Sequence, residues 1–260
     1  MPHPRLGQHF LFKGSILERI AAAACPTPQD LVIEIGPGRG ALTEKLLKRA
    51  ARVVAIEVDR DLAEHLRQKF AGEPRLEIVQ ADVLQTDLAR WGRAPIAGNL
   101  PYYITSPILE QTLPLRFPRA VFLVQKEVAE RLAAPAGSRD YGFLTVRTSV
   151  FATVRKLFEV KPSAFHPPPK VDSAVVLLEP RPAEVALDGA LGDPDGFIRF
   201  VGHCFRQKRK TIRNNLAGVY GKAEIDCWPE ASLRAEQIPL EGFVEMYRRL
   251  RSAEVRESGC

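Results

Sequence analysis

The sequence has few cysteines and no long apolar run. Its four cysteines lie far apart among 260 residues and form no CxxC pair. This spacing argues against a zinc site and a disulfide framework, and it fits reduced thiols in a cytosolic protein. No stretch approaches the ~18–20 apolar residues that a membrane span needs, and the N-terminus lacks the apolar core of a signal peptide. We therefore expect a cytoplasmic protein with no membrane partner and no metal site.

Acidic residues are missing from one segment of an otherwise ordinary chain. Hydrophobic residues make up 45% of the sequence and charged residues 26%, as in a typical globular protein. The net charge of +6 is a moderate indication of an anionic partner. Residues 196–223 contain no Asp or Glu, and five cations crowd together there: Arg206, Lys208, Arg209, Lys210 and Arg213.

Short apolar runs alternate with helical patterns through the first half of the chain. Apolar residues recur at helical spacing at 41–50 and 60–70. Between and around these helices, strands are expected at residues 31–36, 52–59, 75–82, 94–99 and 120–125. Apolar strands separated by helices indicate an α/β fold with a parallel sheet covered on both faces.

The pattern changes toward the C-terminus. A helix is expected at 142–151, followed by strands at 156–160 and 173–180. Beyond Pro182 the pattern is helical, at 196–216 and 242–252, with no strand signal between. We therefore predict a catalytic domain over residues 1–181 and a small all-helical domain over residues 182–260.

Polar residues and glycines follow the carboxyl ends of the predicted strands, which is the edge where open parallel sheets bind ligands. The glycines of "EIGPGRGALT", including Gly36 and Gly38, let the backbone approach a ligand closely. Glu57 ends the second strand and can accept hydrogen bonds from both hydroxyls of a ribose. Asp82 ends the third and can accept one from an adenine amino group. Together they outline a site for an adenosine moiety.

The glycine loop alone does not identify the ligand. Read as G-x-G-x-x-A (Gly36, Gly38, Ala41) with Glu57 as the ribose acid, it also fits a dinucleotide fingerprint. Pro37, however, removes an N–H group that a phosphate cradle would use. This favours S-adenosylmethionine, and an NAD-dependent oxidoreductase stays as an alternative.

The segment Asn99-Leu100-Pro101-Tyr102 suggests what the donor methylates. The exocyclic amine of adenine is a poor nucleophile because its lone pair is shared with the ring. The Asn99 oxygen and a neighbouring backbone carbonyl can accept both of its hydrogens, while Tyr102 offers a face on which a flipped-out base can stack. Positioning for in-line displacement then supplies most of the rate.

Seven segments together resemble the KsgA family of bacterial small-subunit ribosomal RNA adenine dimethyltransferases. They are "GQHFL", "EIGPGRGALT", "NLPY", "QKEVAERL", "FHPPPKVDSAVV", "FRQKRKTIRNNL" and "LRAEQIPLEGF". The resemblance implies a Rossmann-like, S-adenosylmethionine-dependent methyltransferase. It also implies dimethylation at N6 of two adjacent adenosines in the 3′-terminal hairpin loop of small-subunit RNA. The partner would be an immature small subunit, in whose assembly the protein takes part.

The resemblance also implies roles for individual residues. Those of the donor site are His9 and Leu11 over the methionine end, Gly36 and Gly38 beneath it, Glu57 at the ribose, Asp82 and Val83 at the adenine, and Asn99 at both donor and amine. Tyr102 and Phe165 would sandwich the target base, although a phenylalanine near a strand start is also a common core residue. The family often has Asn at the positions of His9 and Tyr103, so these two residues depart from its pattern.

The cations of the acid-free segment are expected to contact RNA. Charge runs are usually solvated helix faces, and here Phe205, Ile212 and Leu216 define an apolar side by helical spacing. Like charges this dense destabilise one another unless a polyanion neutralises them. We therefore expect Arg206, Lys208, Arg209, Lys210 and Arg213 to form an RNA-binding stripe.

Two further alternatives remain at this level. One is an adenine methyltransferase of the same class that acts on large-subunit RNA. The other is a non-catalytic assembly factor, against which the presence of Glu57, Asp82 and Asn99 argues. Nothing in the sequence demands more than a monomer.

Overall fold

The computed structural model describes residues 8–115, 117–181 and 192–257, which divide into two compact units. The first comprises the described residues up to Ala129 together with Ala152–Pro180. The second comprises Glu130–Phe151 and the described residues from Arg181 onward. The segment 130–151 thus groups with the C-terminal helices. The predicted boundary between residues 181 and 182 assigns the same segment to the first domain. The domain boundaries themselves stay a prediction.

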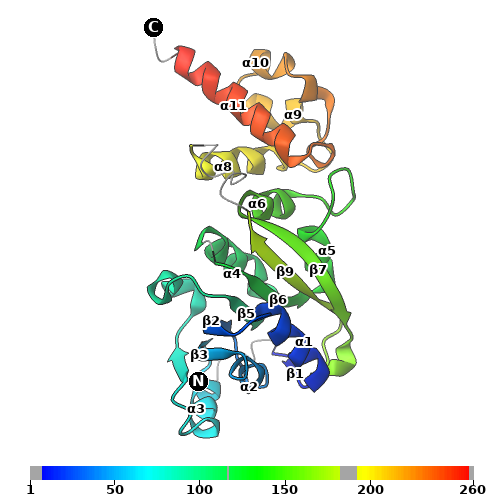
Figure 1. Cartoon of the computed structure of the whole chain (residues 1–260). Helices are drawn as coiled ribbons and strands as arrows, with labels where there is room; N and C mark the ends of the chain where they lie inside the picture. Colours follow the sequence, from blue (N-terminus) through cyan, green and yellow to red (C-terminus); the bar gives the residue numbers. More distant parts are fainter. Residues whose placement is uncertain (1–7, 116, 182–191, 258–260) are drawn as a thin grey trace. The chain divides into compact units, whose positions relative to one another are not determined.

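A seven-stranded sheet forms the centre of the first unit (Figure 1). Its strands lie in the order β4-β3-β2-β5-β6-β9-β7. Their bounds are β2 Gln29–Ile35, β3 Ala50–Glu57, β4 Leu76–Gln80, β5 Ile96–Asn99, β6 Ala120–Gln125, β7 Ala152–Val160 and β9 Ser173–Pro180. Strands β2 to β6 pair in parallel, which confirms the predicted α/β sheet.

The last two strands are antiparallel, an orientation that the sequence pattern did not specify. Strand β9 pairs antiparallel with both β6 and β7. A parallel pair needs a long crossover, usually a helix. Residues 161–172 instead return the chain to the neighbouring strand, and they carry β8 (Phe165–His166), which pairs with β1 (Phe10–Leu11) in a separate two-stranded sheet.

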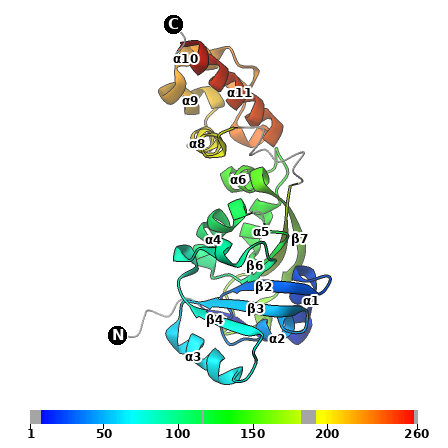
Figure 2. The ribbon, with the colours of Figure 1, turned by 60° about the vertical axis from the view of Figure 1, so that its left-hand side comes forward.

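Helices cover both faces of the sheet (Figure 2). The bounds in this unit are α1 Gly14–Ala24, α2 Thr43–Leu46, α3 Arg60–Lys69 and α4 Thr105–Thr112, with α5 Lys126–Leu132 running from one unit into the other. Leu17 of α1 and Leu46 of α2 pack in one core cluster with Val32 of β2. Ile33, the next residue of β2, is also buried. Because successive strand side chains point to opposite faces, both faces are covered, as predicted.

Helix α2 is shorter than the helix expected at 41–50. It ends at Leu46, and strand β3 already begins at Ala50. Helix α3 closely matches the helix expected at 60–70. The Asp59 side chain caps its N-terminus by accepting hydrogen bonds from the N–H groups of Asp61 and Leu62.

The second unit is helical. Its helices are α6 Phe143–Phe151, α8 Pro194–Cys204, α9 Ile212–Tyr220, α10 Lys222–Asp226 and α11 Leu240–Glu257. Phe197, Phe200 and Phe243 are fully buried in its core. None of the helices in the described part of the chain is long and apolar enough to cross a bilayer.

The prediction of one continuous helix at 196–216 is wrong. Helix α8 ends at Cys204, and α9 begins after Thr211, whose hydroxyl accepts a hydrogen bond from the Asn214 N–H group as an N-cap. The intervening residues 205–211, here called the basic loop, carry four of the five clustered cations. Apolar residues on either side of the loop produced the false helical period, since Ile212 and Leu216 do face the core.

Candidate active site

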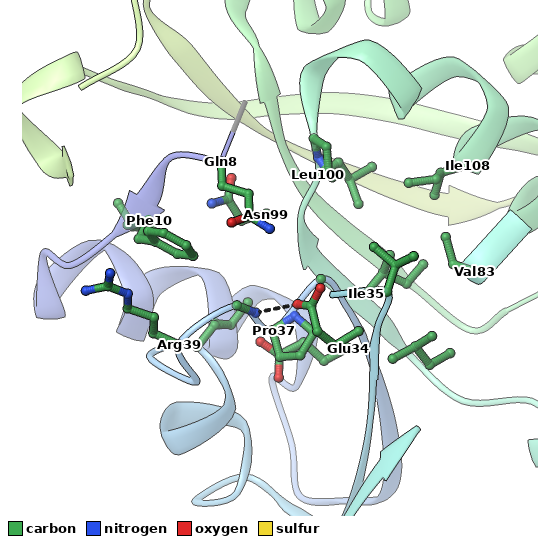
Figure 3. A pocket seen from close by; sticks show the side chains of 18 of the residues that line it. Gln8, Phe10, Glu34, Ile35, Pro37, Arg39, Val83, Asn99, Leu100 and Ile108 are labelled. Atoms are coloured by element: carbon green, nitrogen blue, oxygen red, sulfur yellow. Dashed lines mark hydrogen bonds between the residues drawn. The ribbon is translucent and has the colours of Figure 1, made fainter. Parts of the chain in front are cut away.

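A pocket opens at the carboxyl edge of the parallel strands, where the sequence predicts a ligand site. The chain runs outward in opposite directions from β2 and β5, so these neighbours mark the switch point of the sheet. Gly36, Glu57, Asp82 and Asn99 follow or end four adjacent strands, and all four line this pocket. In Figure 3, Phe10 and Arg39 lie at one end of the pocket, Val83 and Ile108 lie at the other, and Asn99 lies between them.

The glycine loop forms the floor of the pocket and cannot carry side chains at two of its positions. Gly38 has a φ of 56°, and a Cβ there would lie 3.1 Å from the Phe10 ring. Gly40 has a φ of 79°, and a Cβ there would lie 2.6 Å from the Phe70 ring. Both positions therefore require glycine, and the Phe10 and Phe70 rings pack directly against the backbone there.

Glu57 connects this loop to the end of β3. Its Oε2 accepts a hydrogen bond from the Gly38 N–H at 3.0 Å, and its Oε1 accepts one from the Asp59 N–H at 3.0 Å. Burial raises the pKa of the Glu57 carboxyl, and these two backbone hydrogen bonds oppose the rise. Each carboxylate oxygen can accept a second hydrogen bond, so the acid can hold the loop and two ribose hydroxyls together.

Asp82 faces the apolar end of the pocket. Its Oδ1 caps the turn at Val83–Gln85 by accepting from the Leu84 N–H at 2.9 Å. No described residue donates to Oδ2, so this oxygen can accept from an adenine amine. Val83 lines the pocket beside it and is buried. An apolar wall next to a single acceptor suits an adenine ring.

Asn99 is held in a fixed orientation at the end of β5. Its Nδ2 donates to the backbone carbonyl of His9 at 2.9 Å, so the donor side of the amide is occupied. No described residue donates to its Oδ1 or to the Leu100 carbonyl. Asn99 and Leu100 both line the pocket, and two such acceptors match the two hydrogens of an adenine amine.

The basic loop of the second unit is exposed and pinned from beneath by one buried amide. Asn215 donates from Nδ2 to the carbonyls of Cys204, Gln207 and Lys210 at 2.8, 3.2 and 3.4 Å. Its Oδ1 accepts from the Gln207 N–H at 3.1 Å. Arg206, Lys208, Arg209 and Lys210 are all exposed on this loop.

Arg213 lies outside the loop and has an acidic partner, which the absence of acids from residues 196–223 did not foretell. It belongs to α9, and its Nε pairs with the Asp226 carboxylate of α10 at 2.7 Å. Lys208 donates to the Arg139 carbonyl at 3.1 Å. Arg206, Arg209 and Lys210 therefore have the strongest structural case for binding an external anion.

Comparisons with known proteins agree with this geometry. A sequence model for ribosomal RNA adenine dimethylase matches residues 2–250. Ribosomal RNA small subunit methyltransferase A of Acidobacterium capsulatum is 42% identical over 95% of this chain and 90% of that protein. The crystal structure of a dimethyladenosine transferase from Plasmodium falciparum has a TM-score of 0.77 at 27% identity, covering 96% of this chain and 98% of that chain. The 23S rRNA methyltransferase ErmE has a TM-score of 0.67 at 31% identity, covering 93% and 99%.

The chain belongs to the ribosomal RNA adenine dimethylase family. The family resemblance seen in the sequence is thereby confirmed, and with it the enzyme class, an S-adenosylmethionine-dependent methyltransferase with a Rossmann-like sheet. This membership decides against the NAD-dependent oxidoreductase, which the glycine loop alone could not do.

The two aromatic residues expected to sandwich the target base lie in different surroundings in this adenine dimethylase. Tyr102 is half-buried, and its hydroxyl forms a hydrogen bond of 2.6 Å with Ser173 Oγ. Phe165 is 3% exposed and packs in the core with Leu11, its partner across the β1–β8 pair. A stacking role for Phe165 stays a prediction, and it would require this ring to be uncovered.

Phe10, Arg39 and Glu34 are among the pocket-lining residues that sequence reasoning overlooked. Phe10 lies against Gly38, and the Arg39 guanidinium carbon lies 4.8 Å from the centroid of the Phe10 ring. Glu34 is buried beneath the loop, where burial raises its pKa to about 8 while the Thr43 hydroxyl donates to it at 2.6 Å. Phe10 stands between the predicted residues His9 and Leu11, so its neighbours were a usable signal. The surroundings of Glu34 depend on contacts that no local pattern reports.

Proposed function

We propose that this protein transfers methyl groups to N6 of two adjacent adenosines in the 3′-terminal hairpin loop of small-subunit ribosomal RNA, dimethylating each. Its partner is an immature small subunit, in whose assembly it takes part as a monomer in the cytoplasm. The identity of 42% to a small-subunit methyltransferase over nearly the whole chain supports this substrate.

The observation that carries the proposal is the fixed amide of Asn99. Because its Nδ2 is bound to the His9 carbonyl, its Oδ1 is left to accept a hydrogen bond, as is the carbonyl of the next residue, Leu100. An adenine amine held by both acceptors loses conjugation with its ring and gains nucleophilic character. This preference for the pyramidal nitrogen is an interaction that strengthens toward the transition state.

The pocket fits S-adenosylmethionine by its own chemistry. Asp82 and Val83 would take the adenine, Glu57 the ribose, and the backbone at Gly36 and Gly38 the methionine portion. His9 and Leu11, which also line the pocket, would border the methionine end. The bound donor supplies a methyl group activated by its sulfonium. The residues of the chain supply alignment, and no metal takes part in the proposal.

Exposed cations of the basic loop would bind the RNA backbone. Arg206, Arg209 and Lys210, with Lys208 beside them, project from a loop whose shape is fixed by Asn215. Phosphate contacts of this kind position an RNA without reading its sequence. Arg213, already paired with Asp226, would contribute more weakly.

The deciding experiment is one methylation assay with three substrates. Unmethylated small subunits, mature small subunits and large subunits are incubated with labelled S-adenosylmethionine, and the modified nucleoside is identified. We expect N6,N6-dimethyladenosine in the unmethylated small subunit alone, and no label with Asn99→Ala. Label in the large subunit would instead favour the activity named for ErmE, and the absence of label from every RNA would leave a non-catalytic assembly factor.

A further inference from the structure

We propose that Arg39 binds the α-carboxylate of the methyl donor and thereby fixes the direction in which the donor lies in the pocket. This inference deepens the proposed function and rests on its placement of S-adenosylmethionine. The family resemblance assigns Arg39 no role.

Charges are distributed unevenly around the pocket. Of the described residues that line it, Arg39 is the single Lys or Arg, whereas the acids are Glu34, Glu57 and Asp82. Figure 3 shows Arg39 beside Phe10, at the end of the pocket opposite Val83, the residue that follows Asp82. The carboxylate is the one anionic group of S-adenosylmethionine, and it would be repelled by carboxylates at the adenosine end. A donor whose adenosine lies at Asp82 and Glu57 therefore directs its carboxylate toward the cation.

The main chain of Arg39 is held in place without help from its side chain. The Gly40 N–H donates to the Pro37 carbonyl at 2.9 Å and closes a turn that contains Arg39. From α3, the Lys69 Nζ donates to the Arg39 carbonyl at 3.0 Å. The side chain itself is exposed. A substitution at this position should therefore leave the glycine loop intact.

The Arg39 guanidinium lies over an aromatic ring that is itself fixed. Its central carbon is 4.8 Å from the centroid of the Phe10 ring. Phe10 pairs with His166 across the β1–β8 ladder, and its ring packs against Gly38. A guanidinium on an aromatic face keeps the N–H donors at its edges for a carboxylate, which it can bind in a bidentate manner. No acid in the described part of the chain pairs with Arg39, so these donors are available to a ligand.

The carboxylate takes no part in methyl transfer. It is the same group in the donor, in the transition state and in the product S-adenosylhomocysteine. Arg39 should therefore bind all three equally, which lowers the KM for the donor and leaves kcat unchanged. This makes Arg39 a positioning residue of the donor site.

The test compares ligands with and without the carboxylate, by calorimetry in the absence of RNA. The ligands are S-adenosylmethionine, S-adenosylhomocysteine and decarboxylated S-adenosylmethionine. For Arg39→Leu we expect the Kd of the first two to rise about 5- to 30-fold and that of the decarboxylated donor to stay within about twofold of wild type. Arg39→Lys keeps the charge without the planar fork and should give an intermediate effect.

Arg90→Leu is the matched control. Arg90 is also exposed, and its guanidinium carbon lies 4.8 Å from the centroid of an aromatic ring, that of Trp91, but it does not line the pocket. This variant should change none of the three affinities. At saturating donor, Arg39→Leu should methylate unmethylated small subunits within about threefold of the wild-type rate.

Three results for Arg39→Leu would overturn the assignment. Equal weakening of the intact and decarboxylated donors would mean that Arg39 acts through packing on Phe10. Unchanged affinity for all three ligands would mean that its side chain serves no ligand, and a slower rate at saturating donor with unchanged donor affinity would make it an RNA contact. Because the affinities are measured without RNA, a wild type that methylates no small subunit would refute the proposed substrate and leave the carboxylate assignment standing. A wild type that binds none of the three ligands would refute the proposed donor site, and the role of Arg39 with it.

Discussion

Replacing Asn215 by alanine should weaken RNA binding without removing any charge from the protein. The Asn215 side chain is 6% exposed, and it bonds to backbone groups at both ends and in the middle of the basic loop. If the loop cations bind phosphate, this amide pre-organises them. Losing it should leave the same charges on a less ordered loop.

The size of the effect follows from the surroundings of each bond. The Cys204 carbonyl is buried, so leaving it unpaired should destabilise the second unit by about 1–3 kcal/mol. The other partners lie on the exposed loop, where water replaces the amide at little cost. Their loss instead frees backbone that RNA must order again, at about 1–2 kcal/mol per residue. Ordering one or two residues therefore costs about 1–4 kcal/mol, which corresponds to roughly a 5- to 900-fold loss of affinity.

Filter binding to unmethylated small subunits over a salt series distinguishes loop order from charge. Asn215→Ala should lower affinity at every salt concentration and leave the slope of log affinity against log salt unchanged. The double variant Arg209→Ala/Lys210→Ala should flatten that slope by up to about one to two units and leave donor affinity unaltered. Asn214→Ala is the matched control, since that residue is exposed and its side chain bonds to no described residue. Unchanged affinity for Asn215→Ala at a lowered melting temperature would refute the reasoning and leave this amide a purely structural role.

Three further substitutions test the pocket. Asp82→Ala should weaken S-adenosylmethionine binding by about 1–3 kcal/mol in calorimetry, and an unchanged affinity would contradict its role at the adenine. Asn99→Ala should slow single-turnover methylation far more than it weakens subunit binding; a rate within about threefold of wild type, ~0.7 kcal/mol, would exclude it as the catalytic acceptor. Glu34→Gln tests pH dependence: burial raises the pKa of Glu34 from 4.5 to about 8, so the unfolded chain releases this proton at lower pH than the folded one. Folding stability of the wild type should therefore decline between these two pH values, by at most about 5 kcal/mol, and thermal unfolding of Glu34→Gln should lack that decline.

The strand ends were predictable from sequence because period and chemistry agree there. Buried parallel strands are continuously apolar, so a carboxylate or amide that ends such a run, as at Glu57 and Asn99, stands out. The basic segment misled because apolar residues on both sides of a loop can mimic a helical period. The sequence contains both the N-cap Thr211 and the loop-binding Asn215. A capping residue and a buried amide, however, are recognised only once their hydrogen-bond partners are known.

Contacts between distant parts of the chain explain why the remaining site residues could not be read from the sequence. Residues 8–11 become part of the pocket through three separate contacts: the His9 carbonyl with Asn99, Phe10 with Gly38, and Leu11 with Phe165. Each joins this segment to a different region, the end of β5, the glycine loop and β8. The same segment therefore borders the proposed donor site through Phe10 and Leu11, and it orients the catalytic amide through the His9 carbonyl. A shift of β1 would alter both at once, so donor binding and base binding should be energetically coupled through residues 8–11, and by linkage the coupling must be equal in both directions.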